Sequence, residues 1–121
     1  MIDREWAVEF AERWIAAFNS HDLDSIFELY EDDFTMTSPF IAERMGIERG
    51  VLVGKENVRP YWENSLAVDP PLTFLLIDVF VGVSSIVVYY ENIGRKVVCE
   101  TFTFSKSGKV SSGCSQHGEA Q

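Results

Sequence analysis

The sequence predicts a small α+β domain in which three N-terminal helices pack on a curved antiparallel sheet and enclose one ligand-sized pocket. Apolar and aromatic residues recur at helical spacing in the first half of the chain. Short turns containing glycine separate runs rich in β-forming residues in the second half. The length of 121 residues and the hydrophobic content of 46% fit one domain with a buried core. We therefore treat residues 1–121 as a single domain.

Two helices are expected at the N-terminus. Asp3 can cap a helix that runs to about residue 18, and its apolar face repeats every four residues at Trp6, Phe10, Trp14 and Phe18. Asp22 can cap a second, shorter helix, whose apolar face consists of Leu23, Ile26, Phe27 and Tyr30. Each helix therefore has one face to bury against a sheet.

The middle of the chain predicts a strand, a loop and a third helix. A short strand covers residues 34–38 and ends at Pro39. Residues 40–54 contain three glycines and are predicted to form a loop that acts as a lid over the pocket. The third helix is expected to start near Asn57 and to pass Leu66, because this start leaves Pro60 within the first turn, where proline is tolerated.

The second half predicts four antiparallel strands, at residues 72–81, 86–91, 96–105 and 109–117. Strict alternation along the first of them gives two apolar faces, one with Leu75, Ile77, Val79 and Val81 and the other with Leu72, Phe74, Leu76 and Phe80. The helices can cover only one face of the sheet. We therefore expect a homodimer that packs through the outer face of the sheet.

Charge and motif content restrict the partners. The net charge of −9 disfavours binding to nucleic acid or to a membrane surface, so a small ligand is the expected partner. The sequence contains no phosphate-binding glycine loop and no zinc ligand set, and the acidic residues of the segment 22–33 lack calcium-loop spacing. We expect no cofactor and no metal. Cys99 and Cys114 form no CxxC motif, and the chain opens on charged residues rather than on a leader, which favours reduced thiols in the cytoplasm.

Three motifs, in this order and spacing, resemble those of the nuclear transport factor 2-like superfamily. The first is WIAAFNSHDLD at residues 14–24, the second is LYEDDF at residues 29–34 followed by SPF at 38–40, and the third is GKENV at residues 54–58. The resemblance implies a cystatin-like cone of the SnoaL-like and ketosteroid-isomerase-like branch. This fold hosts isomerases, cyclases, dehydratases and proteins without known chemistry, so it does not imply one reaction.

The resemblance also implies positions for a site. Ketosteroid isomerases use an aspartate as general base and an oxyanion hole of a tyrosine and a protonated aspartate. By the flanking motifs, the base position falls on Ser38, the tyrosine position on Trp14 and the protonated acid on Glu100. Serine is not a base without assistance, and an indole lacks the acidity of a phenol. The isomerase reaction in its usual form is therefore not expected.

Glu100 and His117 are the candidate catalytic residues. Glu100 shares its face of the strand with Val98, Phe102 and Phe104, and burial of a carboxyl group raises its pKa, so Glu100 could act as a general acid or oxyanion donor. The alternative is a glutamate at the strand edge that reaches solvent or pairs with Arg95 or Lys96. His117 at the end of the last strand could turn inward and act as the base. Its alternative is a histidine in solvent near the chain end.

Five residues are predicted to form the pocket wall, although core packing alone would explain each of them: Trp14, Phe18, Met36, Ser38 and Trp62. Three functions remain open. The first is a SnoaL-like protein that binds a small apolar or partly polar molecule. The second is an isomerase, cyclase or dehydratase that acts on a hydrophobic ring compound carrying a carbonyl group, with Glu100 as acid or oxyanion donor. The third is a non-catalytic protein-interaction module, favoured if the protein's own side chains fill the pocket.

Overall fold

The computed structural model describes residues 1–120, which form an α+β domain with four α-helices on one six-stranded curved sheet. The strand order is β2-β1-β6-β5-β4-β3. The elements in chain order are α1 (Arg4–Asn19), α2 (Leu23–Phe27), β1 (Tyr30–Thr37), α3 (Pro39–Met45), β2 (Val51–Val53), α4 (Lys55–Leu66), β3 (Leu75–Val81), β4 (Ser85–Asn92), a short 3-10 turn (Ile93–Arg95), β5 (Lys96–Phe104) and β6 (Val110–Ala120). The predicted fold class is confirmed, with one helix more than expected.

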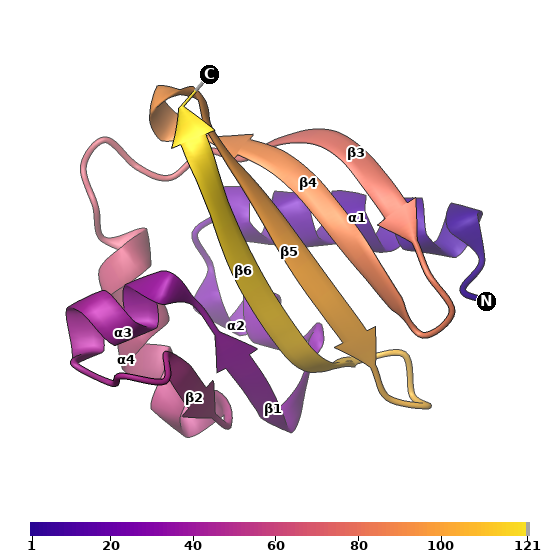
Figure 1. Cartoon of the computed structure of the whole chain (residues 1–121), viewed down its shortest axis with the longest axis horizontal. Helices are drawn as coiled ribbons and strands as arrows, with labels where there is room; N and C mark the ends of the chain where they lie inside the picture. The colour runs from indigo at the N-terminus through magenta and orange to yellow at the C-terminus, as the bar shows by residue number, and fades with distance from the viewer. Residues whose placement is uncertain (121) are drawn as a thin grey trace.

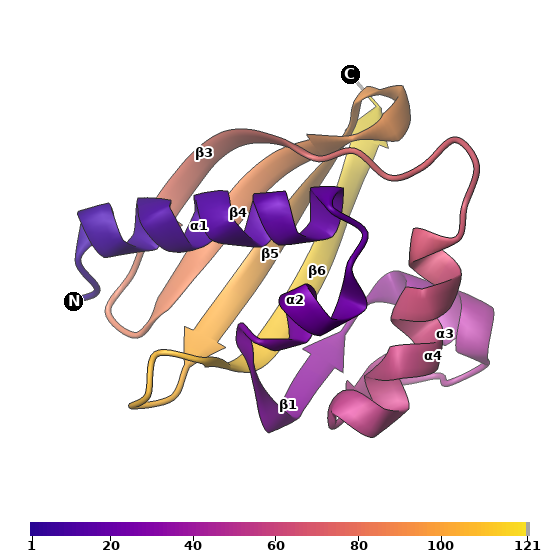
Figure 2. The ribbon, with the colours of Figure 1, turned by 180° about the vertical axis from the view of Figure 1, so that it is seen from behind.

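The helices all lie on one side of the sheet. In Figure 1, strands β3 to β6 form a curved surface with α1 behind them. In Figure 2, which is the view from the opposite side, α1 crosses in front of the strands, and α2, α3 and α4 are grouped beside β1. The sheet therefore has an inner face under the helices and an outer face that no element of residues 1–120 covers.

The first helix forms as its pattern predicts. The Asp3 side chain accepts a hydrogen bond from the Trp6 backbone N–H at 3.0 Å and caps the N-terminus. Phe10, Trp14 and Phe18 are buried along the predicted apolar face, whereas Trp6 at its outer end is 37% exposed. Asp22 caps α2 as expected. The predicted apolar face of α2 is wrong at Tyr30, which is the first residue of β1.

The loop predicted for residues 40–54 is wrong, because most of this segment is α3 and β2. Ser38 caps α3 through its side-chain oxygen, which accepts from the Phe40 N–H at 3.2 Å, and Pro39 occupies the first turn. Gly50 has a φ of 64°, and a Cβ atom there would lie 2.8 Å from the Ser38 carbonyl oxygen. The glycines therefore mark tight turns between short elements, and Ile41 anchors α3 in the core.

The start predicted for the third helix is also wrong, because α4 begins at Lys55 and contains Pro60 in its interior. Gly54, with a φ of 87°, turns the chain, and its carbonyl oxygen accepts from the N–H groups of Asn57 and Val58, both at 3.1 Å. Pro60 has no N–H to donate to the preceding turn. Burial of Val58, Tyr61 and Trp62 compensates, since packing of an apolar face contributes most of the stability of a short helix.

The sheet is antiparallel from β3 to β6, but β1 pairs with β6 in parallel. The last strand extends beyond the predicted end at residue 117. His117 therefore lies inside β6, where it pairs with Val98 of β5, and not at a frayed terminus.

The predicted assignment of faces in β3 is wrong, because the pairing with β4 shifts between Leu76 and Asp78. Ile77 is the extra residue of this bulge, and each bulge exchanges the faces of the residues that follow it. Leu76 and Val79 therefore both face inward, opposite Tyr90 and Val88. The outer face retains apolar residues all the same, including Leu75 and Phe80, which are 65% and 52% exposed.

Candidate functional site

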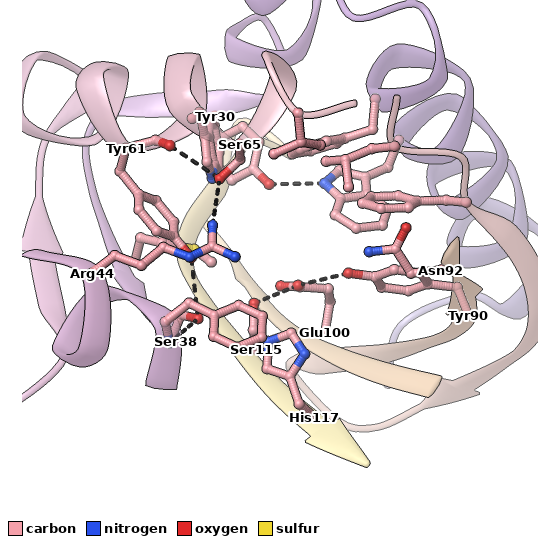
Figure 3. A pocket seen from close by; sticks show the side chains of 18 residues that line it. Tyr30, Ser38, Arg44, Tyr61, Ser65, Tyr90, Asn92, Glu100, Ser115 and His117 are labelled. Carbon is pink, nitrogen blue, oxygen red and sulfur yellow. Dashed lines mark hydrogen bonds between the residues drawn. The ribbon is translucent and has the colours of Figure 1, made fainter. Parts of the chain in front are cut away.

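A cavity of about 100 Å³ lies between the inner face of the sheet and the helices, and it opens to solvent. It is smaller than the roughly 300–1,000 Å³ typical of pockets for drug-sized ligands, so its size suits a small molecule. The protein's own side chains do not fill it. Its walls are Trp14, Phe18, Tyr30, Met36, Ser38, Phe40, Arg44, Tyr61, Trp62, Ser65, Val68, Leu72, Phe74, Tyr90, Asn92, Glu100, Ser115 and His117 (Figure 3).

The seven residues that the sequence singled out all line this one cavity. The aromatic walls come from α1 and α4: the rings of Trp14 and Phe18 lie 4.8 Å apart, and those of Phe18 and Trp62 lie 5.4 Å apart. Met36 of β1 and Ser38 at the start of α3 close one side. Whether these residues bind a ligand remains a prediction, but the tertiary structure brings them together.

Glu100 lies in the middle of β5 and points into the cavity with 4% of its surface exposed. Its Oε1 accepts hydrogen bonds from the Ser115 hydroxyl at 2.5 Å and from the Tyr90 hydroxyl at 3.2 Å. Its second oxygen, Oε2, has no hydrogen bond within residues 1–120 and is not sealed from solvent, since no buried side-chain N or O atom of these residues lacks a partner. Hydrogen bonds thus hold one carboxyl oxygen of Glu100 in place, and the other oxygen is available to a ligand.

Burial raises the pKa of Glu100 to about 7, because removal from water disfavours the charged carboxylate. The hydrogen bonds from Ser115 and Tyr90 favour the carboxylate and oppose this rise, but they do not cancel it. Glu100 is therefore present in both protonation states near neutral pH. Within residues 1–120 no base lies within ion-pair distance of Glu100, and Arg95, one of its two predicted partners, lies 3.8 Å from Glu91 instead.

Tyr30 offers a second donor beside Glu100. The indole N–H of Trp14 donates to the Tyr30 hydroxyl oxygen at 2.8 Å, and the Tyr30 proton has no acceptor within residues 1–120. Burial is the main cause that raises the pKa of Tyr30 well above its ordinary value, and the negative charge of Glu100 adds to the rise. The hydrogen bond from Trp14 opposes it without cancelling it. Tyr30 thus remains a neutral donor at physiological pH. The resemblance assigns the tyrosine position of ketosteroid isomerases to Trp14, and the Trp14 side chain here donates a hydrogen bond to a tyrosine of β1.

His117 lies at the mouth of the cavity, with its ring against that of Phe40 at a centroid distance of 4.2 Å. Partial burial lowers the pKa of His117, and the positive charges of Arg44 and Lys96 lower it further. Its imidazole is therefore neutral at pH 7 and able to accept a proton. His117 and Glu100 lie on the same face of β5 and β6 as diagonal neighbours, whose Cβ atoms are typically about 7–8 Å apart.

Ser38, which the resemblance places at the position of the general base, has a structural role. Its hydroxyl oxygen caps α3, and the Tyr61 hydroxyl lies 3.4 Å from it. No carboxylate or imidazole contacts Ser38 within residues 1–120, so nothing there could activate it as a base.

Sequence reasoning missed several polar residues of the cavity, chiefly Tyr30, Arg44, Tyr61, Tyr90 and Ser115. Alternation along β4 and β6 was a usable signal for two of them, since Tyr90 follows Ile86 and Val88 inward and Ser115 precedes His117 by two residues. Tyr30 was missed because it was assigned to a helix, and Arg44 because its segment was assigned to a loop.

Within residues 1–120, no group of three or more His, Cys, Asp or Glu side chains is arranged to hold a metal ion. No helix in this part of the chain is long and apolar enough to cross a membrane.

Comparison with known proteins gives a consistent assignment. The model of the SnoaL-like domain matches residues 11–115. A SnoaL-like protein of unknown function from Burkholderia thailandensis E264 is 35% identical with a TM-score of 0.93, over 97% of this chain and 98% of that chain. The epoxide hydrolase/cyclase-like enzyme SalBIII, with a role in pyran ring formation in the polyether salinomycin, is 21% identical with a TM-score of 0.71, over 98% and 95% of the two chains. TerC, co-crystallised with polyporic acid, is 14% identical with a TM-score of 0.74, over 93% and 92%. The last two share the fold.

Proposed function

Because the chain belongs to the SnoaL-like family, we propose that its cavity binds a small ring compound carrying a carbonyl or hydroxyl group and that Glu100 acts on this compound as a general acid. The reaction that we propose is an isomerisation, a cyclisation or a dehydration, each of which can use a general acid. A cyclase-like enzyme and a protein crystallised with polyporic acid share the fold, which supports a ring-shaped ligand. Neither assigns a reaction to this chain.

The proposal rests on the protonation state of Glu100 and on its position in the cavity. A carboxyl group with a pKa of about 7 that faces a cavity with one free oxygen can donate a proton at neutral pH. A purely structural strand does not need a buried acid, and a neutral carbonyl oxygen beside Glu100 and Tyr30 would accept from two donors. These donors would stabilise negative charge that develops on that oxygen.

The proposed step is enolisation of a ring ketone. His117 takes a proton from the carbon next to the carbonyl, and the C–H electron pair forms a carbon–carbon double bond. The carbonyl π electrons move to oxygen, which receives the Glu100 proton. In a β,γ-unsaturated ring ketone the product of this step is a dienol. Transfer of the His117 proton to its γ-carbon, and return of the hydroxyl proton to Glu100, complete an isomerisation to the conjugated ketone with no external reactant. In a β-hydroxy ketone, the enol electrons instead expel hydroxide from the β-carbon, which leaves as water with the His117 proton. The enol hydroxyl proton returns to Glu100, and the result is a dehydration.

Binding without chemistry is the second candidate, and the aromatic walls support it. Trp14, Phe18 and Trp62 form a surface on which a flat ring can pack, whatever Glu100 does. The protein-interaction module has less support, because the cavity is open.

Deuterium exchange separates catalysis from binding. Cyclohexanone in D2O loses its α-proton signals in the proton NMR spectrum as enolisation proceeds. We expect wild-type protein to accelerate this loss above the buffer rate, and Glu100→Gln and His117→Ala each to lower the protein's contribution by roughly 100-fold, the lower end for general acid–base catalysis. His21→Gln removes the other histidine and serves as the control. Exchange at the buffer rate with wild-type protein would leave only the binding function.

The pH dependence of the deuterium-exchange rate is a second test of the proposed step. The step needs neutral His117 and protonated Glu100. The rate should therefore fall as pH rises above about 7, where Glu100 loses its proton, and also fall below the lowered pKa of His117. A rate that keeps rising from pH 7 to pH 9 would contradict Glu100 as the acid.

We also propose a homodimer in which the outer faces of two sheets pack together. Leu75 and Phe80 are 65% and 52% exposed there, and Val83 in the turn between β3 and β4 is 80% exposed, although large apolar patches are unusual on the surface of a monomer. The outward residues in the middle of β4 and β5 are Val87, Tyr89, Cys99 and Thr101, whereas Asp78 of β3 and Glu91 of β4 are acidic residues on the same face. We place the contact between the two copies on this middle part, which has no acidic or basic residue, because each chain has a net charge of −9.

Sedimentation tests the dimer. We expect a dimer at micromolar concentration that Phe80→Asp converts to a monomer. Met45→Asp is the matched control, since Met45 is 37% exposed on α3, on the helical side of the sheet. A wild-type monomer at these concentrations would refute the proposal.

We further propose a cytoplasmic location. Cys99 and Cys114 are free thiols on the outer face, and partly exposed thiols persist in reducing compartments. Fractionation of cells that express the chain, with alkylation of the thiols before lysis, would test it; recovery of a disulfide would contradict the proposal.

A further inference from the structure

The mouth of the cavity carries a cation that the proposed step does not use. Arg44 of α3 lines the cavity and is exposed to solvent. No carboxylate within residues 1–120 lies within ion-pair distance of Arg44, as is also true of Arg13 and Arg49, but neither of those two arginines lines the cavity.

The structure holds the Arg44 guanidinium in place without using most of its donors. Its central carbon lies 4.6 Å from the centroid of the Phe40 ring, and its Nη1 lies 3.5 Å from the Ser65 hydroxyl. Stacking on a ring fixes the plane of the guanidinium and leaves its in-plane N–H groups free. Phe40 also packs against the His117 ring, so Phe40 contacts both Arg44 and His117.

Other free donors lie around the same mouth. The Asn92 side-chain oxygen accepts from the Ile93 N–H at 2.7 Å, while its amide N–H groups have no acceptor within residues 1–120. Asn92 and His117 both line the cavity with Arg44. The arrangement thus offers donors and no carboxylate acceptor at the entrance.

The local electrostatics are positive although the chain carries a net charge of −9. The charged groups that act on His117 are Arg44 and Lys96, and both lower its pKa. Burial raises the pKa of Tyr61 inside the cavity; the hydrogen bond to Ser38 and the positive charge of Arg44 oppose this rise, and the charge of Glu100 adds to it. A planar anion that entered here would find a fork of N–H groups on one side and an aromatic interior beyond.

We propose that the ligand is a small ring compound with a carboxylate group, which Arg44 binds at the mouth while the ring lies among the aromatic walls and its carbonyl or hydroxyl group faces Glu100. The inference rests on the binding half of the proposed function and does not require turnover. It narrows the ligand class from ring compounds in general to ring carboxylates.

A matched pair of probes tests this assignment by calorimetry: 4-oxocyclohexanecarboxylate and 4-oxocyclohexanecarboxamide, which differ mainly in charge. We expect wild-type protein to bind the carboxylate at least 10-fold more tightly than the amide. Arg44→Gln should abolish that preference and change amide affinity less than 2-fold, and Arg44→Lys should keep part of the preference. Arg49→Gln is the control, since Arg49 is exposed near α3 and does not line the cavity.

Three results would overturn the inference. They are equal affinity for the two probes, an equal loss of carboxylate affinity in Arg44→Gln and Arg49→Gln, and no binding of either probe. Tighter binding of cyclohexyl phosphate with the same dependence on Arg44 would replace carboxylate by phosphate monoester. A carboxylate preference without deuterium exchange would support this inference and refute only the catalytic function.

Discussion

Replacement of Glu100 by glutamine should change how the stability of the protein depends on pH. Glutamine has nearly the shape of a protonated glutamate, and its carbonyl oxygen can still accept from Ser115 and Tyr90, as Oε1 does. It does not titrate. Below pH 4.5, where Glu100 is protonated in both the folded and the unfolded chain, the two proteins should differ little in their free energy of unfolding.

The sign and size of the effect follow from the pKa of Glu100, which folding raises from 4.5 to about 7. Between these values the folded chain binds the proton and the unfolded chain releases it, so the free energy of unfolding of the wild type falls as pH rises. Above pH 7 both states are ionised and the fall is complete. At 1.36 kcal/mol per pKa unit, the loss amounts to about 3 kcal/mol. Glu100→Gln should therefore be more stable than the wild type by about that amount at pH 8.

Urea unfolding at pH 5, 6, 7 and 8, at one protein concentration, measures this difference. Glu43→Gln, at an exposed position of α3, removes one negative charge without a change in the cavity and serves as the reference. Curves for wild type and Glu100→Gln that run parallel within about 0.5 kcal/mol from pH 5 to pH 8 would refute the raised pKa. The role of Glu100 as an acid at neutral pH would be refuted with it.

Three further changes test other parts of the site by urea unfolding. Trp14→Phe leaves the buried Tyr30 hydroxyl without its donor and should cost about 2–3 kcal/mol; a loss below about 1 kcal/mol would show that the hydrogen bond is dispensable. Gly50→Ala should destabilise the protein by about 2–3 kcal/mol and more than Gly46→Ala, because both glycines have positive φ but only Gly50 has a backbone atom within 3 Å of the added Cβ; equal losses would contradict this. Ser38→Ala removes the cap of α3 and should cost about 1 kcal/mol, while the deuterium-exchange rate per folded molecule stays the same; loss of exchange would give Ser38 a catalytic role.

Local patterns were enough to predict much of the fold. The caps at Asp3 and Asp22 have side-chain hydrogen bonds in the structure, and the alternation of β5 placed Glu100 on the buried face with Val98 and Phe102. Such signals depend on neighbours within a few residues in the chain, so the sequence contains them directly. The prediction was wrong where one local sequence pattern is compatible with two structures. Three glycines in residues 40–54 fit a loop as well as two short elements joined by tight turns, and one bulge at Ile77 exchanged the faces of β3.

The sequence by itself determined the fold class and the aromatic face of α1, because the periodicity of apolar side chains does not depend on where distant elements lie. It placed Glu100 on an apolar face of its strand but left open whether the carboxyl group is buried or reaches solvent. Only the tertiary structure decided what surrounds Glu100. It placed Ser115 and Tyr90 on one carboxyl oxygen, brought Tyr30 and Trp14 beside the cavity, and set Arg44 over Phe40 at the entrance. These contacts join residues from β1, α1, α3, β4 and β6. The pairing of strands and the packing of helices fix them, and no single stretch of the sequence contains that information.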